Sequence, residues 1–394
     1  MKPSLIKLSL FLCLSMSLGI GILRFSYTAL LPYTRDAFGW SNDFASILSS
    51  ANLLGYLIGA FTAMRLPQTK IMSAFIQIAA IFGMISLLCC AFSGFPSTWY
   101  IFWRIVSGMS GGLIMILAPS IIALCAGLND RLKINFIGFS GIGFGVLIST
   151  CFLSYIDQIS IQAAWLILCT TAFLICIYIA YALREFKKDL PSTLNSYTST
   201  VKVNILFYSL LIAYSSSAFA YIPHSLFWID YLSHDLKLRL PLVNLNWILY
   251  GVGSALGAFV GYLFAKKIGN FKALKTLYST YILAILIATF SFNQLFIFAS
   301  SFLTGLLNPA VVFLTSYTIL QLYGISYKKL WSITTLSFAS IQLIGGLSFS
   351  YLQKIGFTYH QQFFIGTFVL MIGTVQLFIF LKSENSVSEL SVTK

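Results

Sequence analysis

Residues 8–32 read LSLFLCLSMSLGIGILRFSYTALLP and contain a single charged side chain, that of Arg24. About 20 consecutive, mostly apolar residues are enough for a helix to cross a bilayer. A guanidinium in hydrocarbon is costly and is kept mostly where it lines a cavity or a pathway. The stretch therefore predicts a membrane helix that carries a functional cation.

The rest of the chain has the same character. Of its 394 residues, 58% are apolar and only 9% are charged, whereas soluble domains carry about 25% charged residues. We predict an all-α polytopic membrane protein with twelve transmembrane helices in two pseudo-symmetric six-helix halves. The predicted spans are 8–34, 44–64, 71–93, 98–126, 134–156, 161–183, 204–230, 242–264, 273–292, 294–322, 331–352 and 358–381.

Two features divide the twelve spans into six and six. The largest hydrophilic break is Arg184–Val203, and residues 54–61 (LGYLIGAF) resemble residues 252–259 (VGSALGAF) 198 positions later. We predict an N-terminal half at 1–183, a cytoplasmic linker at 184–203, and a C-terminal half with a short cytoplasmic tail at 204–394. The repeated glycines are expected to be packing residues, because small residues let helix backbones approach closely.

The net charge of +14 is explained by membrane orientation rather than by nucleic-acid binding. Cytoplasmic loops of membrane proteins are enriched in lysine and arginine. On the predicted topology 18 basic residues fall on the side of the termini and four on the other, which predicts that both termini are cytoplasmic. The four on the other side are Arg35, Lys237, Arg239 and Lys354.

Two motifs resemble those of the major facilitator superfamily of secondary transporters, as do the two six-helix halves with a basic linker between them. Residues 104–112, RIVSGMSGG, resemble its fourth-helix motif R-x-x-x-G-x-x-G. Residues 262–269, YLFAKKIG, are expected in a loop and resemble the gating motif G-x-L-A-D-R-x-G, with Lys266 at the acidic position. The equivalent segment 64–70, MRLPQTK, has lost most of that pattern. The candidate gating residues are Lys266, Lys267 and Gly269.

The first span carries a more specific resemblance. Residues 19–32, GIGILRFSYTALLP, resemble the signature G-x-G-I-G-R-F-A-Y-T-x-L-L-P of the bacterial YbfB/YjiJ-like permeases, with Leu23 in place of a glycine. The resemblance implies the transporter fold over nearly the whole chain, but no particular substrate.

The resemblance also implies that helices 1, 4, 7 and 10 line a central cavity. The unusual polar residues of these helices are the candidate substrate-binding residues: Arg24, Arg104, His224, Asn308, Tyr27 and Tyr221. All ten acids lie in loops or at span ends, so the intramembrane cations are expected to bind an anion. The alternative for each candidate is structural: hydrogen bonds to carbonyls, helix contacts, a proline kink beside His224 and Asn308, or aromatic packing.

These observations predict a secondary active transporter that moves a small solute, an organic anion, across the bacterial inner membrane by alternating access. A drug or metabolite efflux pump and a sugar-type permease for a neutral solute remain alternatives. A membrane-embedded acyltransferase-type enzyme is a remote one, because His224 and Asp230 do not share a helix face. We expect a monomer in the lipid bilayer without catalytic residues, metal or cofactor. The coupling ion stays open, a proton included.

Overall fold

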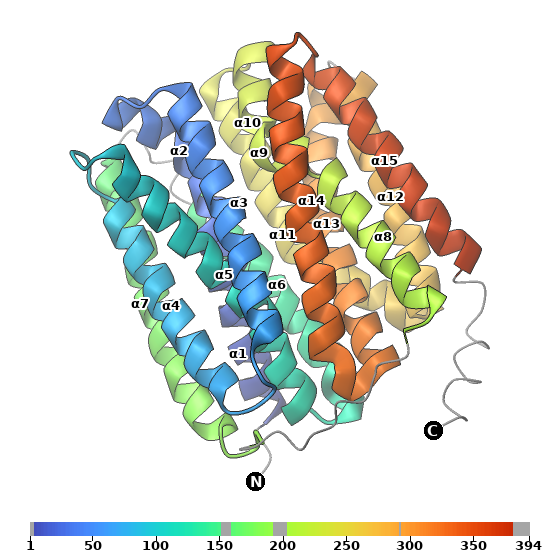
Figure 1. Cartoon of the computed structure of the whole chain (residues 1–394). Coiled ribbons are helices and arrows are strands. Elements are labelled where there is room, and N and C mark those ends of the chain that lie inside the picture. Colours follow the sequence, from blue (N-terminus) through green and yellow to red (C-terminus); the bar gives the residue numbers. More distant parts are fainter. Residues whose placement is uncertain (1–3, 151–158, 192–202, 291–292, 381–394) are drawn as a thin grey trace.

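The computed structural model describes residues 4–150, 159–191, 203–290 and 293–380, and these are helical apart from short connections. This confirms the predicted all-α membrane fold. Helices α1–α7 are called the N-terminal group here and α8–α15 the C-terminal group; they lie on opposite sides in Figure 1. The start of α1 and the end of α15 lie at the same end of the molecule.

Within the described residues, each predicted span coincides with one helix or with a series of consecutive helices; residues 151–156, 291–292 and 381 of these spans lie outside the described part. Ten helical stretches of the described chain are long and apolar enough to cross a membrane, and one of them, Gln294–Lys354, contains two predicted spans. The uninterrupted helices are α3 (Asn42–Arg65), α4 (Ile71–Cys90), α5 (Ser97–Cys125), α6 (Arg131–Thr150), α7 (Ile161–Phe186), α11 (Leu240–Ile268), α12 (Asn270–Phe290), α13 (Gln294–Tyr323), α14 (Tyr327–Lys354) and α15 (Tyr359–Phe380).

The first predicted span contains a long π-helical segment between two α-helices. Among the described residues, no other predicted span contains a π-helix of this length. The first span consists of α1 (Leu5–Met16), the π-helix η1 (Ser17–Phe25) and α2 (Ser26–Phe38). π-Helical turns are rare and are frequently found at functional sites. Arg24 lies in the last turn of η1.

The seventh predicted span is broken into shorter pieces. It runs through α8 (Ile205–Ala220), α9 (Ile222–Leu226), α10 (Trp228–Asp230) and the π-helix η4 (Tyr231–Asp235). Pro223 lies at the start of α9, where its missing N–H needs no helical partner. Short 3₁₀ turns, η2 (Leu128–Asp130) and η5 (Gly324–Ser326), precede α6 and α14.

The repeated glycines make equivalent backbone contacts in the two groups. A Cβ on Gly55 of α3 would lie 2.0 Å from the carbonyl oxygen of Ile105 in α5. A Cβ on Gly253 of α11 would lie 2.2 Å from the carbonyl oxygen of Phe302 in α13. Both pairs of helices therefore touch backbone to backbone at positions related by the sequence repeat, as expected for packing glycines.

The two groups meet along two helix pairs, α6 with α11 and α3 with α14. At Gly143 the α6 backbone is so close to α11 that an added Cβ would lie 2.0 Å from the Ala255 nitrogen. At one end of the second pair, Lys328 of α14 donates to the carbonyl oxygens of Ala63 and Leu66, at the end of α3. Closely packed helices of both groups thus surround the interior.

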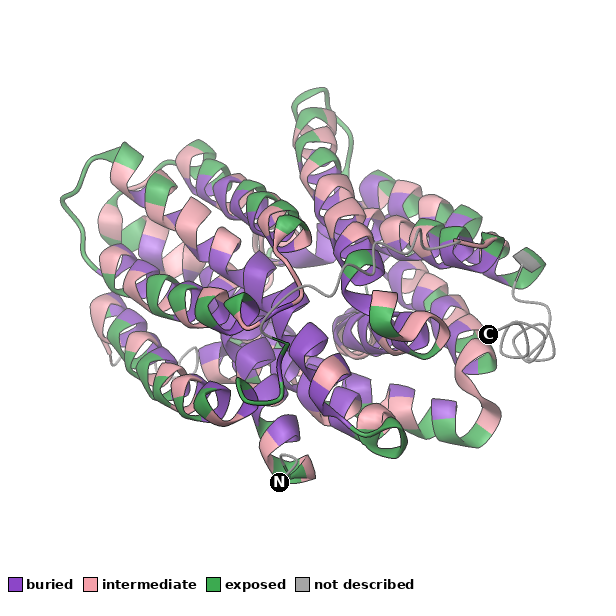
Figure 2. Cartoon of the chain, turned by 60° about the horizontal axis from the view of Figure 1, so that its bottom comes forward, coloured by how far each residue is buried: buried purple, intermediate pink, exposed green. Residues whose placement is uncertain are grey.

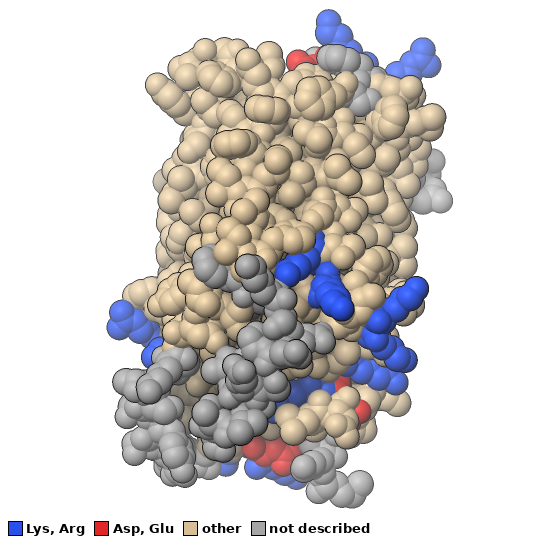
Figure 3. Space-filling view, turned by 90° about the vertical axis from the view of Figure 1, so that its right-hand side faces the viewer, with Lys and Arg blue, Asp and Glu red and all other residues tan. Residues whose placement is uncertain are grey.

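Burial and charge follow the pattern of a membrane protein. Buried residues face one another between the helices, and exposed residues cover the outside (Figure 2). Large apolar side chains such as Leu174 and Phe368 are 62% and 57% exposed. On the face shown in Figure 3, the described residues form a broad band without charged side chains, between a mainly basic lower end and a few charges at the upper end. That band is where acyl chains would contact the protein.

Two details differ from the sequence-based expectation. Lys266 and Lys267 do not lie in a loop: α11 continues to Ile268, and the turn comes at Gly269, whose φ is 82°. Arg184 still belongs to α7. The predicted linker therefore begins later than expected, and its residues 192–202 lie outside the described part of the chain.

Candidate functional site

Arg24 joins the two groups in the interior of the molecule. Its Nη2 donates a 2.7 Å hydrogen bond to Oε1 of Gln342 in α14, a residue 318 positions away in the sequence. The guanidinium carbon also lies 5.3 Å from the ring centre of Phe25 and 5.6 Å from that of Tyr56. Aromatic faces attract a cation at these distances, but they do not neutralise its charge.

Arg104 is the second interior cation and is 3% exposed. Its guanidinium lies over the ring of Tyr27, with the guanidinium carbon 4.0 Å from the ring centre. Its Nη1 is 3.5 Å from the carbonyl oxygen of Leu23, which is the upper limit for a hydrogen bond. Its Nε has no hydrogen-bond partner among the described residues. The donors of Arg104 are therefore incompletely satisfied.

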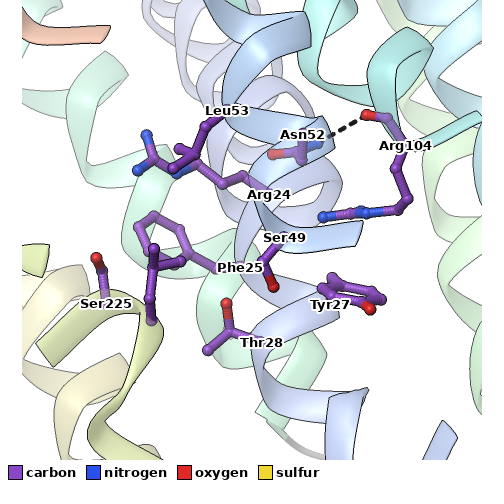
Figure 4. Close-up of a pocket in the computed structure, with 10 residues that line it drawn as sticks. Arg24, Phe25, Tyr27, Thr28, Ser49, Asn52, Leu53, Arg104 and Ser225 are labelled. Atoms are coloured by element: carbon purple, nitrogen blue, oxygen red, sulfur yellow. Dashed lines mark hydrogen bonds between the residues drawn. The ribbon is translucent and has the colours of Figure 1, made fainter. Parts of the chain in front are cut away.

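The two arginines line one pocket. Arg24 comes from η1 and Arg104 from α5, hydroxyl and amide groups come from α2, α3 and α9, and none of the described lining residues is acidic. In Figure 4 the Arg104 side chain extends over the ring of Tyr27 toward Arg24. The guanidinium of Arg24 points in the direction away from Arg104. The lining residues are Arg24, Phe25, Tyr27, Thr28, Ser49, Asn52, Leu53, Arg104, Ser225 and Leu226.

Electrostatically, this pocket favours an anion. Two guanidinium groups without a nearby carboxylate produce a positive potential, which is strong where little water screens it. Neither arginine forms a salt bridge within the described chain, where the two ion pairs found are Lys7–Glu185 and Arg35–Asp36. The pocket itself has room for about one water molecule. A larger solute would therefore require the surrounding helices to separate.

The other polar candidates do not line this pocket. His224 is fully buried; its Nε2 is 3.0 Å from Oγ of Ser300, and its ring stacks on Trp228 at 4.3 Å. The structure therefore does not bring His224 to the two arginines, although its neighbour Ser225 does line the pocket. Asn308 is 7% exposed, and its Oδ1 has no partner among the described residues.

The aromatic candidates pack beside the arginines. The hydroxyl of Tyr27 donates to the carbonyl oxygen of Ala45 at 3.2 Å. The hydroxyl of Tyr221 is hydrogen-bonded to that of Tyr250, and both rings lie against Phe25, with centroid distances of 6.4 and 6.2 Å. This cluster joins α8, α11 and η1 next to Arg24.

The candidate gating residues lie at the end of α11 and do not line the pocket. Lys266 and Lys267 are exposed at the end of α11, and neither forms a salt bridge within the described chain. The lysine that does connect the two groups is Lys328, which is only 4% exposed. In the sequence, Lys328 was recognisable only as one of the basic residues at a helix end.

Several residues around the arginines were not identified from the sequence. In the sequence, Gln342 is as compatible with a helix contact as with substrate binding, and no motif by itself singles out Tyr250, Ser49, Thr28 or Ser225. Ser49 and Asn52 are three positions apart in α3 and so lie on one helix face. That spacing of polar residues in an apolar helix was the available signal.

Comparisons with known proteins agree with this architecture. Residues 16–377 match the family described as "Uncharacterised MFS-type transporter YbfB". No curated protein matched the sequence. Among solved structures, the proton:xylose symporter XylE has a TM-score of 0.72 at 14% identity, with 95% of each chain covered. The human organic anion transporter MFSD10 has a TM-score of 0.71 at 13% identity, covering 95% of this chain and 100% of MFSD10.

At these identities the two solved structures establish the fold alone. The family match covers most of the chain, including η1, both interior arginines and the helices that surround them. The chain therefore belongs to the YbfB-like family of major facilitator superfamily transporters.

Proposed function

We propose that this transporter moves a small organic anion across the bacterial inner membrane by alternating access, with Arg24 as the main anion-binding residue. The observation that carries the proposal is the pocket lined by Arg24 and Arg104 without an acidic residue among its described lining. A guanidinium presents a planar set of donors that matches a carboxylate or a phosphate in bidentate fashion. Arg104 would contribute from the other side of the same pocket.

The remaining lining groups would select among anions. Ser49, Asn52, Thr28 and Ser225 offer hydroxyl and amide groups that can hydrogen-bond to a polar solute. His224 would act indirectly, by holding the segment that carries Ser225. The proposed anion class is compatible with the printed description of the structural neighbour MFSD10 as an organic anion transporter.

A permease for a neutral sugar is the second candidate. The structural neighbour XylE is a xylose symporter, and the hydroxyl groups in the pocket would suit sugar hydroxyls. A neutral solute, however, would leave the buried guanidinium of Arg104 and the half-buried one of Arg24 without counter-charge, which is unfavourable in a low-dielectric interior.

The proposed orientation follows from the basic end of the molecule. Cytoplasmic segments are enriched in basic residues, so the end with Lys328, Lys266 and Lys267 would face the cytoplasm. On this assignment both termini are cytoplasmic. The predicted halves at 1–183 and 204–394 would then rock about the contacts between α6 and α11. We propose an ion gradient as the driving force, and the proton is the first ion to test.

A thermal-shift experiment tests the substrate class. Purified protein is melted with sodium acetate, succinate, citrate or phosphate, and with xylose or tetraethylammonium, all at equal ionic strength. We expect at least one anion to raise the melting temperature of the wild type. The same anion should not change the melting temperature of the Arg24→Gln variant. Stabilisation by xylose or tetraethylammonium alone, or an anion effect that survives in Arg24→Gln, would contradict the proposal. Uptake of the identified anion into proteoliposomes under a pH gradient then tests coupling.

A further inference from the structure

Gln342 is the hydrogen-bond acceptor that the C-terminal group presents to Arg24. It lies in α14, its side chain is fully buried, and its Oε1 accepts the 2.7 Å bond from Arg24. Among the described residues, Gln342 is the side chain to which Arg24 donates a hydrogen bond. Besides the contacts of Phe25 with Tyr221 and Tyr250, the two groups are therefore joined at Arg24 by a hydrogen bond to a neutral acceptor, which does not itself line the pocket.

An amide oxygen resembles a carboxylate oxygen in shape and hydrogen-bond geometry but carries no full charge. Hydrogen bonds between a guanidinium and a carboxylate are stronger and are commonly bidentate. Gln342 thus satisfies Arg24 only in part, and an anion that reaches Arg24 would be the better acceptor. The amide oxygen occupies a position that an anion oxygen could take.

The other end of the same amide is unsatisfied. Nε2 of Gln342 is buried and has no hydrogen-bond partner among the described residues. A buried donor without an acceptor is unfavourable and calls for an explanation. An anion bound between η1 and α14 would supply the missing acceptor while also pairing with Arg24.

We propose that Gln342 is an internal substitute for the transported anion. In the empty protein its Oε1 holds Arg24; when the anion binds, it replaces Oε1 on Arg24 and accepts a hydrogen bond from Nε2. The direct bond between the two groups is thereby exchanged for two contacts to the anion. Gln342 becomes a substrate-binding and selectivity residue on α14. This inference rests on the proposed function, because it assumes that Arg24 binds the anion.

The substitution Gln342→Glu tests this exchange because it places a permanent carboxylate where the anion oxygen is expected. The new carboxylate would pair with Arg24, so the empty protein should melt at or above the wild-type temperature. The affinity for acetate, succinate, citrate or phosphate should fall at least tenfold, because Arg24 is already occupied.

Gln362 provides a matched control. It is fully buried in α15, and neither of its amide atoms has a hydrogen-bond partner within the described chain. No described arginine is hydrogen-bonded to Gln362, so a carboxylate introduced there by Gln362→Glu should lower the melting temperature. An equal fall for Gln342→Glu and Gln362→Glu would show that residue 342 is only a buried amide, and would overturn the proposal.

A double-mutant cycle identifies the partner. Combined with Arg24→Gln, the Gln342→Glu substitution should lower the melting temperature, although alone it should not. The loss of additivity is expected because the two side chains interact directly. Additive effects of the two substitutions would overturn the pairing.

The binding data separate this inference from the proposed function. If none of the four anions stabilises the wild type, or if Arg24→Gln keeps the full effect, the anion site itself is wrong and this inference falls with it. If wild-type binding depends on Arg24 but Gln342→Glu keeps full affinity, the anion site stands and the role of Gln342 is overturned.

Discussion

The ammonium of Lys328 lies 2.7 Å from the carbonyl oxygen of Leu66 and 2.8 Å from that of Ala63. Leu66 is the C-cap of α3, where unpaired carbonyls and the helix dipole attract a cation. Lys328 lies at the start of α14, in the C-terminal group. A buried cation of one group thus caps a helix of the other, next to residues 64–70, where the usual gating pattern is degenerate.

Loss of this contact should weaken the packing of α14 against α3 at the basic end of the molecule. We expect Lys328→Met to lower the melting temperature, because each charge-assisted hydrogen bond contributes about 1.5–3 kcal/mol. The neighbouring lysine, Lys329, is exposed, so Lys329→Met should leave the melting temperature close to that of the wild type. The measurement is thermal unfolding of both variants in the same detergent. Equal melting of Lys328→Met and wild type would mean that the contact does not stabilise this arrangement.

The repeat-related glycines should be required for folding. Gly55→Leu and Gly253→Leu place a bulky side chain where the neighbouring backbone already lies within 2.2 Å of an ideal Cβ. Overpacking of this kind costs about 1–3 kcal/mol and sometimes more, so expression and melting temperature should fall for both. Gly127 is exposed, has an extended backbone and meets nothing closer than 3.9 Å. Gly127→Leu is therefore the control; normal melting of the first two variants with altered solute selectivity would instead indicate a binding role.

The orientation of the chain is tested by chemical labelling. In a cysteine-free background, a cysteine at Lys237 should react with an impermeant maleimide in intact cells, and one at Ser196 should react only after the cells are opened. Lys237 lies between η4 and α11, whereas Ser196 belongs to the predicted cytoplasmic linker and lies outside the described residues. Labelling of position 196 in intact cells would reverse or refute the proposed topology.

The geometry of the guanidinium should matter as well as its charge. Arg24→Lys keeps a cation but loses the planar set of donors, so the affinity for a stabilising carboxylate should fall. Arg24→Gln should weaken binding further, by about ten- to hundred-fold relative to wild type, the equivalent of one charged hydrogen bond. Isothermal titration of the three proteins measures the order. A purely structural arginine would predict lower melting temperatures for both variants and no selective loss of anion binding.

The fold and part of the candidate site were predictable from the sequence for clear physical reasons. The cost of charge in hydrocarbon makes Arg24 and Arg104 conspicuous in apolar runs, and both line one pocket. The length of the apolar runs located the helices to within a few residues. The repeated glycines were recognised because backbone contact permits few alternatives to glycine.

The remaining contacts depend on distances that the sequence does not contain. Gln342 is neutral and 318 residues from Arg24, so neither charge nor spacing indicates the pair. Lys328 resembled any basic residue at a helix end until the structure placed it on the C-terminus of α3. His224 was grouped with the arginines because it is polar and lies on a helix expected to line the cavity, but its ring faces Ser300 and Trp228 instead.

The π-helix η1 also has a consequence for sequence comparison. Its wider turns hold more residues than α-helical turns of the same length, so relatives that lack one residue within Ser17–Phe25 can still keep Arg24 and α2 in place. Such a deletion would convert a π-helical turn into an α-helical turn with 3.6 residues, so the faces of α1 and α2 would stay close to their present positions. An alignment gap in this segment would therefore mark members of the family in which the arginine stands on an ordinary α-helical turn while α1 still packs against α6.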